Sequence, residues 1–180
     1  MQEQGLELEV RWLPYELNED TPEEGIPLSE YYGVTPDRVA SMQTGLQRRA
    51  AELGLPFRAP EMLSNTRKAH RLAEYAREQG KLEPLHRALF HAHFVEGRNL
   101  ADDEVLRELA RAAQLDPAEA LAALDDPRYG AAVEANLQRA RDIGVTGVPT
   151  FLVDGRYKIV GAQPYAELRD ILLRIAERGL

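Results

Sequence analysis

The sequence predicts an α/β protein in which a β-sheet is interrupted by a large all-helical insertion. Three observations support this fold class: an alternating apolar stretch near the N-terminus, more than a hundred residues of helical periodicity, and a C-terminal strand pair followed by a helix. Strands at both ends with helices between them are typical of such an arrangement. We therefore expect residues 1–17 and 144–180 to form the sheet domain and residues 18–143 to form the helical insertion.

The first expected strand covers residues 6–12, where apolar and polar side chains alternate (LELEVRW). A period of two residues is the pattern of a strand with one buried face. The strand should end before Pro14, because proline cannot donate a hydrogen bond to a sheet. Residues 18–28 are rich in acidic residues, proline and glycine, and we expect a loop there.

Helical spacing of apolar side chains then predicts six helices. Most of them begin at a capping residue or a proline, and most of them stop at a glycine. The expected ranges are 36–53, 65–80, 84–97, 102–113, 117–124 and 127–143.

The C-terminal part predicts a hairpin and one more helix. Residues 150–153 are apolar and lead into Asp154-Gly155, a strong signal for a two-residue hairpin turn. Residues 157–160 form the expected return strand, and Pro164 opens the last helix. Four apolar side chains of that helix share one face and should point inward: Leu168, Ile171, Leu172 and Ile175.

Composition excludes several functional classes. The net charge of −8 gives no electrostatic support for nucleic-acid binding. No apolar run is long enough to span a bilayer, and residues 1–10 do not have the pattern of a secretory signal. The 180 residues contain no cysteine, so disulfides, thiolate catalysis and cysteine-ligated metals are absent from them. We expect a cytoplasmic protein without a cofactor.

The histidines do not predict a metal site. His86 and His93 fall on the same side of one expected helix, but they are two turns, roughly 10 Å, apart. His91 points elsewhere on that helix, and we expect all three to be solvated or half-buried. His70 is expected to pack against the insertion.

Other polar and aromatic residues near the expected sheet also receive structural interpretations. Paired acidic residues stand at loops or helix starts, where they stabilise helix N-termini. Trp12 and Tyr15 are expected to pack in the core. Arg156 and Lys158 are expected on a solvated face of the hairpin.

Four segments of the sequence carry a family resemblance. They are RWLPYELNED (11–20), SNTRKAHRL (64–72), LFHAHFVEGRNL (89–100) and GVTGVPTFLVDGRYKIVGAQP (144–164). In these residues, and in their order, the chain resembles the DsbA-like branch of the thioredoxin superfamily, in particular the FrnE-type oxidoreductases. The resemblance implies a thioredoxin-like sheet that carries an all-helical insertion.

The sequence departs from the family at its start. Family members open with a strand, a Cys-x-x-Cys loop and a helix, and the resemblance begins after that unit. In the family's sheet the absent strand lies between the strands expected at 6–12 and 150–153, so the sheet is incomplete. Two explanations follow: the unit belongs upstream of residue 1, or the chain repairs the sheet by repacking or by pairing with a second copy as a homodimer.

The resemblance assigns a substrate contact to Val148 and Pro149. It implies a cis peptide bond there, beside which an extended thiol- or disulfide-containing peptide, or a small thiol, would bind. Cis bonds occur in about 5–6% of X-Pro pairs, and the alternative is a trans proline that opens a strand. Because disulfide exchange needs an attacking thiolate, no residue of these 180 is assigned a catalytic role.

Three functions therefore remain open. The first is a DsbA/FrnE-like thiol-disulfide oxidoreductase that is catalytically incomplete as given. The second is a relative of the glutathione-dependent enzymes of the kappa and 2-hydroxychromene-2-carboxylate isomerase type, in which serine replaces the cysteine. The third is a non-catalytic peptide-binding protein. The resemblance favours the first.

Overall fold

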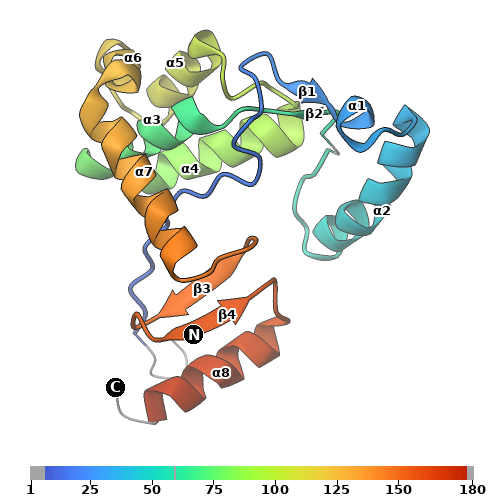
Figure 1. Ribbon diagram of the computed structural model, residues 1–180, viewed down its shortest axis with the longest axis vertical. Coiled ribbons are helices and arrows are strands. Elements are labelled where there is room, and N and C mark those ends of the chain that lie inside the picture. The colour runs from blue at the N-terminus through green and yellow to red at the C-terminus, as the bar shows by residue number, and fades with distance from the viewer. Residues whose placement is uncertain (1–6, 59, 178–180) are drawn as a thin grey trace. The chain divides into compact units, whose positions relative to one another are not determined.

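The structure is a computed structural model that describes residues 7–58 and 60–177 (Figure 1). It divides into two compact units, a sheet unit of residues 1–17 and 136–180 and a helical unit of residues 18–135. The division falls inside a helix, whereas the sequence placed the boundary after residue 143, where that helix ends. Helical periodicity continues unbroken across residue 135, so the sequence has no signal at this position.

The helical unit contains the expected helices with small shifts in their bounds. No helix among the described residues is long and apolar enough to cross a lipid bilayer. The elements of this unit are β1 (Ile26–Pro27), α1 (Leu28–Tyr32), α2 (Pro36–Glu52), β2 (Met62–Leu63), α3 (Arg67–Glu78), α4 (Leu82–His91), the π-helical turn η2 (Ala92–Glu96), α5 (Asp103–Ala112), α6 (Pro117–Asp125) and the start of α7 (Pro127–Asp142).

The core of this unit lies among four helices. Helix α3 packs against α4 and α6, while α5 packs against α4 and α6. Leu72, Leu85 and Leu106 are the largest fully buried side chains, and small alanines fill the space around them. The apolar faces predicted for α3, α4, α5 and α6 are thus covered by neighbouring helices of this group.

The capping signals in the sequence act largely as expected. Asp116 accepts hydrogen bonds from the backbone N–H groups of Ala118 and Glu119, at 2.9 and 3.0 Å. Helix α4 starts two residues before Pro84, because a proline in the first turn needs no N–H partner. Its expected continuation to Gly97 takes the wider π-helical form.

Two segments of the helical unit differ from expectation. Residues 18–28 were expected to be a loop, but they contain β1 and the first residue of α1. Strand β1 pairs with β2 over only two residues. A strand of two residues is too short to leave a periodic signal. The second segment is α2, where the apolar side chains of Met42 and Leu46 are 49% and 63% exposed. The apolar face predicted for this helix is therefore not covered within the described residues.

The sheet unit contains β3 (Thr150–Val153), β4 (Tyr157–Val160) and α8 (Tyr165–Glu177) as predicted. The strand expected at 6–12 is wrong for residues 7–12, which form no strand; residue 6 lies outside the described residues. Side-chain alternation alone cannot make a strand, because the backbone needs a neighbouring strand to bond. The described sheet pairs β3 with β4 alone.

The hairpin turn is one residue longer than expected. Asp154 and Gly155 adopt left-handed conformations, with φ of 50° and 68°, as the Asp-Gly signal predicts. The register, however, pairs Val153 with Tyr157. Arg156 is therefore left outside the ladder, where its N–H donates to the carbonyl of Val153 at 3.0 Å.

Candidate functional site

The loop between α7 and β3, residues 143–149, holds both residues that the sequence assigned to substrate contact. Helix α7 ends at Asp142, and Gly144 follows with φ of +67°, a conformation that favours glycine. The peptide bond between Val148 and Pro149 is cis. Val148 is 51% exposed, two residues before strand β3 begins.

Lys158 fixes the start of this loop. Its Nζ donates hydrogen bonds to the carbonyl oxygens of Ile143 and Gly144, at 2.9 and 3.0 Å. These carbonyls stand just beyond the C-terminus of α7, where a cation also complements the helix dipole. Lys158 is exposed, as expected for a solvated face of the hairpin, and it also has a defined structural role at the loop.

The end of the loop is held by three further hydrogen bonds. The Thr150 hydroxyl donates to the carbonyl of Gly147 at 2.7 Å. The N–H of Gly161 donates to the carbonyl of Pro149 at 2.8 Å, and the Tyr15 hydroxyl donates to the carbonyl of Val145 at 3.3 Å. Within the described residues no hydrogen bond uses the backbone of Val148 itself.

Within the described residues, strand β3 is paired along one edge only. The bond from Gly161 to Pro149 sets the phase of the antiparallel ladder, in which bonded and non-bonded pairs alternate. The pairs Phe151–Ile159 and Val153–Tyr157 are then bonded, while Thr150 and Leu152 direct their N–H and C=O groups away from β4. No described backbone group pairs with that outer edge.

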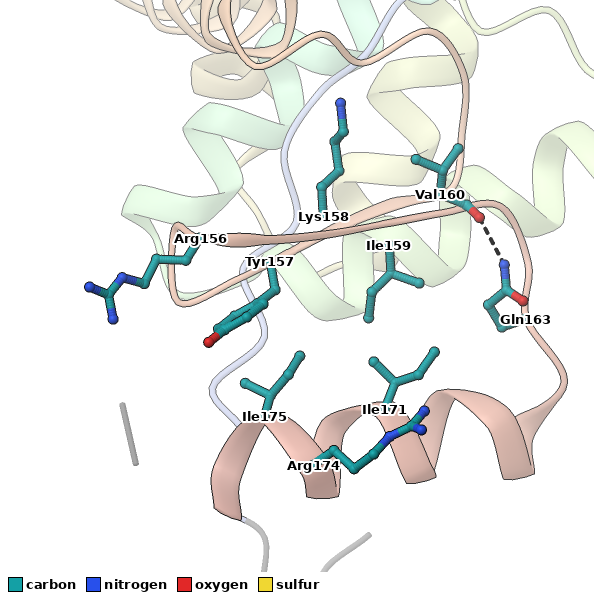
Figure 2. Close-up of a pocket in the computed structure, with 9 residues that line it drawn as sticks. All are labelled: Arg156, Tyr157, Lys158, Ile159, Val160, Gln163, Ile171, Arg174 and Ile175. Carbon is teal, nitrogen blue, oxygen red and sulfur yellow. Dashed lines mark hydrogen bonds between the residues drawn. The ribbon is translucent and has the colours of Figure 1, made fainter. Parts of the chain in front are cut away.

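The opposite edge of the hairpin supports the same phase. Val160 is opposite Thr150, so its carbonyl should point away from β3. The side-chain amide of Gln163 donates to that carbonyl at 2.8 Å (Figure 2). The edge of β4 is therefore partly closed by its own chain.

A hollow of about 620 Å³ lies between β4 and α8. Figure 2 shows Tyr157 and Ile159 pointing from the strand toward the helix, and Ile171 and Ile175 pointing back. Among the described residues, cationic side chains line it and acidic ones do not. The described lining residues are Arg156, Tyr157, Lys158, Ile159, Val160, Gln163, Ile171, Arg174 and Ile175.

Trp12 and Tyr15, both expected in the core, differ in their surroundings. Trp12 is 58% exposed, so its expected place in the core is wrong. The reason is that the strand expected to carry it inward does not form. Tyr15 is half-buried and bonds to the loop, a contact that 130 residues of sequence separation conceal.

His86 and His93 each contact a phenylalanine ring. The rings of His86 and Phe90 lie 6.5 Å apart and those of His93 and Phe94 lie 4.6 Å apart. Burial lowers the pKa of both histidines, and the positive charge of Arg77 lowers that of His86 further. The described residues include no cluster of histidine and acidic side chains able to hold a metal ion.

Comparisons with known proteins agree with this architecture. One curated relative, described as the uncharacterized protein YwbO of Bacillus subtilis, is 28% identical over 152 residues, covering 83% of this chain and 74% of the relative. A crystal structure described as a probable DsbA oxidoreductase from Streptomyces coelicolor is 34% identical, with a TM-score of 0.82. It covers 92% of this chain and 74% of the solved one.

A more distant structure shares the fold. It is described as a candidate protein disulfide isomerase from Nitrosomonas europaea, is 19% identical and has a TM-score of 0.65, over 82% of this chain and 78% of the other. The model of the DSBA-like thioredoxin domain matches residues 1–173. The predicted fold class is therefore confirmed, and the chain belongs to the family of DSBA-like thioredoxin domains.

Proposed function

We propose that these 180 residues supply the peptide-binding part of a DsbA-like thiol-disulfide oxidoreductase of the FrnE type. The substrate would be an extended peptide that carries a thiol or a disulfide, bound at Val148 and Pro149. One observation carries the proposal: Val148 is exposed, in a loop that is tethered on both sides, and its backbone groups form no hydrogen bond within residues 7–58 and 60–177. A held loop with free backbone groups can pair with an extended chain at little conformational cost.

The role proposed for the chain is binding and orientation. Disulfide exchange requires a thiolate that attacks a disulfide sulfur and releases the other sulfur as a thiolate. The 180 residues contain no cysteine, so the attacking sulfur and both sulfurs of the disulfide must come from other molecules or segments. We propose a cytoplasmic location and no cofactor.

The test uses two matched substitutions. Val148 and Val160 are both 51% exposed, but only Val148 belongs to the loop. A fluorescent ten-residue peptide with one cysteine, free or as a mixed disulfide, is titrated into Val148→Asp and Val160→Asp. We expect Val148→Asp to weaken binding at least about tenfold, a change of about 1.4 kcal/mol. Val160→Asp should bind like the original chain, and circular dichroism checks that both variants fold.

Three results would decide against the proposal. Equal loss in both variants would place the peptide elsewhere, and binding of glutathione in place of the peptide would favour the glutathione-dependent alternative. Reduction of insulin by the chain alone would contradict the need for an external thiolate.

A further inference from the structure

A second hollow, of about 320 Å³, lies between α4 and α5 beside the π-helical turn η2. All of its described lining residues lie within residues 88–112, which belong to the helical unit. We propose that this hollow binds a small aliphatic amine in its protonated form. The site is separate from the loop at Val148 and goes beyond the function proposed for that loop.

The floor of the hollow is apolar. It is formed by Leu109, which is 7% exposed, and by the one-carbon side chains of Ala88 and Ala112. Helices α4 and α5 pack against each other, and because each carries an alanine here, space remains between them. Ligand sites begin at about 300 Å³, so this hollow suits a small molecule whose hydrocarbon chain lies on the floor.

The rim of the hollow is a row of four polar side chains. His91 Nδ1 lies 3.2 Å from one carboxylate oxygen of Glu96, and the guanidinium of Arg98 lies 3.6 Å from the other. Arg98 also donates a hydrogen bond of 2.5 Å to Glu108. The row thus contains two carboxylates and one guanidinium, so with a neutral His91 one negative charge is not balanced. A monovalent cation would balance it.

The π-helical turn produces this arrangement of the rim. In an α-helix, side chains three or four residues apart are neighbours, whereas His91 and Glu96 are five residues apart. The i→i+5 pattern of η2 (Ala92–Glu96) brings the two side chains together. The N–H of Arg98 then donates to the carbonyl of Ala92 at 2.9 Å, which fixes the residue that links Glu96 to Glu108. Short π-helical turns are frequent at functional sites.

The floor and the rim together select an alkylammonium ion. Its three N–H donors match the carboxylates of Glu96 and Glu108, because each carboxylate can accept several hydrogen bonds. An anion would be repelled by both carboxylates, and Arg98 is already bonded to them. A metal ion would leave the apolar floor unused. An uncharged chain would leave the charge of the rim unbalanced.

Titration with n-butylammonium chloride, followed by nuclear magnetic resonance at constant ionic strength, tests the site. Butan-1-ol and sodium butyrate carry a similar chain without the positive charge and serve as control ligands. We expect saturable shifts of the backbone amides of Arg98, Leu109 and Ala112 with the ammonium ion only. Equal binding of butan-1-ol or butyrate would overturn the assignment to a cation, and the absence of saturable shifts would overturn the site.

Two matched pairs of variants separate this site from general effects. Glu108→Gln removes a charge from the rim, whereas Glu104→Gln removes the same charge one turn earlier on α5, at a residue that also pairs with an arginine. Ala112→Leu fills the floor, whereas Ala118→Leu places the same side chain at an exposed position of α6. Circular dichroism checks that all four variants fold.

We expect Glu108→Gln and Ala112→Leu to weaken binding of n-butylammonium at least about threefold, which is the size of effect that partly exposed charges produce. Glu104→Gln and Ala118→Leu should bind like the original chain. Equal weakening by Glu108→Gln and Glu104→Gln would show that the ion is attracted by the overall charge of the protein, and this would overturn the proposal.

A lysine side chain ends in the same ammonium group, so a second probe distinguishes a free amine from a partner chain. This probe is the tripeptide glycine-lysine-glycine, acetylated and amidated at its ends. We expect it to bind more weakly than n-butylammonium, because its backbone cannot enter a hollow of this size. Tighter binding of the tripeptide would overturn the assignment to a free amine.

Discussion

The helical unit and the sheet unit differ in how completely they bury their apolar side chains. In the helical unit, Leu72 and Leu106 are 1% and 0% exposed, and helices surround them on several sides. In the described part of the sheet unit, the buried apolar side chains are Leu137, Ile159 and Ile175. The rest of its sheet and of α8 is half-buried or exposed.

The two units also differ in how they satisfy their backbone hydrogen bonds, and this bears on where a peptide can bind. A bundle of helices satisfies its own backbone, so its packed core needs no further partner. A two-stranded sheet cannot do so, because each strand leaves one edge of hydrogen-bonding groups unpaired. The proposed peptide site, at Val148 and Pro149, lies in the unit whose described apolar side chains are less completely buried.

Truncation of a core leucine should produce the largest effect. Leu106→Ala in the bundle is expected to lower the free energy of unfolding by about 2–5 kcal/mol, because a cavity remains among tightly packed helices. Ile175→Ala, beside the hollow, should fall at or below the lower end of that range. Urea unfolding followed by circular dichroism measures both. A greater loss at Ile175 would reverse the comparison.

The single tryptophan makes the two units separable in the same experiment. Trp12 belongs to the sheet unit, while most of the helical signal comes from the other. We expect the fluorescence transition of Trp12 to occur at lower urea than the circular dichroism transition. Coincident transitions would mean that the units unfold together.

Loss of a helix cap should cost less. Asp116→Ala removes the carboxylate that accepts two hydrogen bonds at the start of α6, and we expect a loss of about 0.5–2 kcal/mol. Asp116→Asn retains the accepting oxygen and serves as the control. Equal losses in the two variants would show that charge, not capping, is responsible.

The loop anchor should show a smaller effect on stability than on binding. Lys158→Met removes the ammonium that bonds to the carbonyls of Ile143 and Gly144 but keeps the apolar stem. The ammonium is exposed, so we expect a loss of stability below about 1 kcal/mol. Peptide affinity should fall further, because the loop is no longer held. Unchanged affinity would show that the tether is dispensable.

The pH dependence of the bundle should be the smallest effect. Burial lowers the pKa of His86 and His93, so the unfolded chain binds protons more readily than the folded one. Their contribution to stability is present above the unfolded pKa of about 6.5 and is lost as pH falls below it. The urea midpoint should therefore drop less between pH 7.5 and 5 in the double variant His86→Gln, His93→Gln. An identical drop would exclude these histidines as its cause.

The sequence predicted most of the helical unit because its signals are local. The Asp116-Pro117 start of α6 and the glycine that follows α7 encode helix ends through their own backbone preferences. The hairpin strands were likewise predicted with the right bounds. Only the length of the turn differed, because Asp-Gly specifies two left-handed residues but not the pairing of the residue after them.

The errors concern residues whose structure depends on distant partners. Residues 7–12 have the alternation of a strand, yet no described strand lies beside them to pair with. The contacts of Lys158 and Tyr15 with the loop could not be read from the sequence, because no local pattern encodes them. The loop with Val148 and Pro149 was found through the family resemblance, since a single proline after a glycine-rich turn is common.

Hydrogen exchange of individual backbone amides, measured by nuclear magnetic resonance, tests the proposed peptide contact most directly. In the free chain we predict slow exchange at Phe151 and Val153, which bond to β4, and faster exchange at Val148, whose backbone has no hydrogen bond within the described residues. Addition of the extended peptide should slow exchange at Val148. Unchanged exchange at Val148 in the presence of saturating peptide would contradict the account.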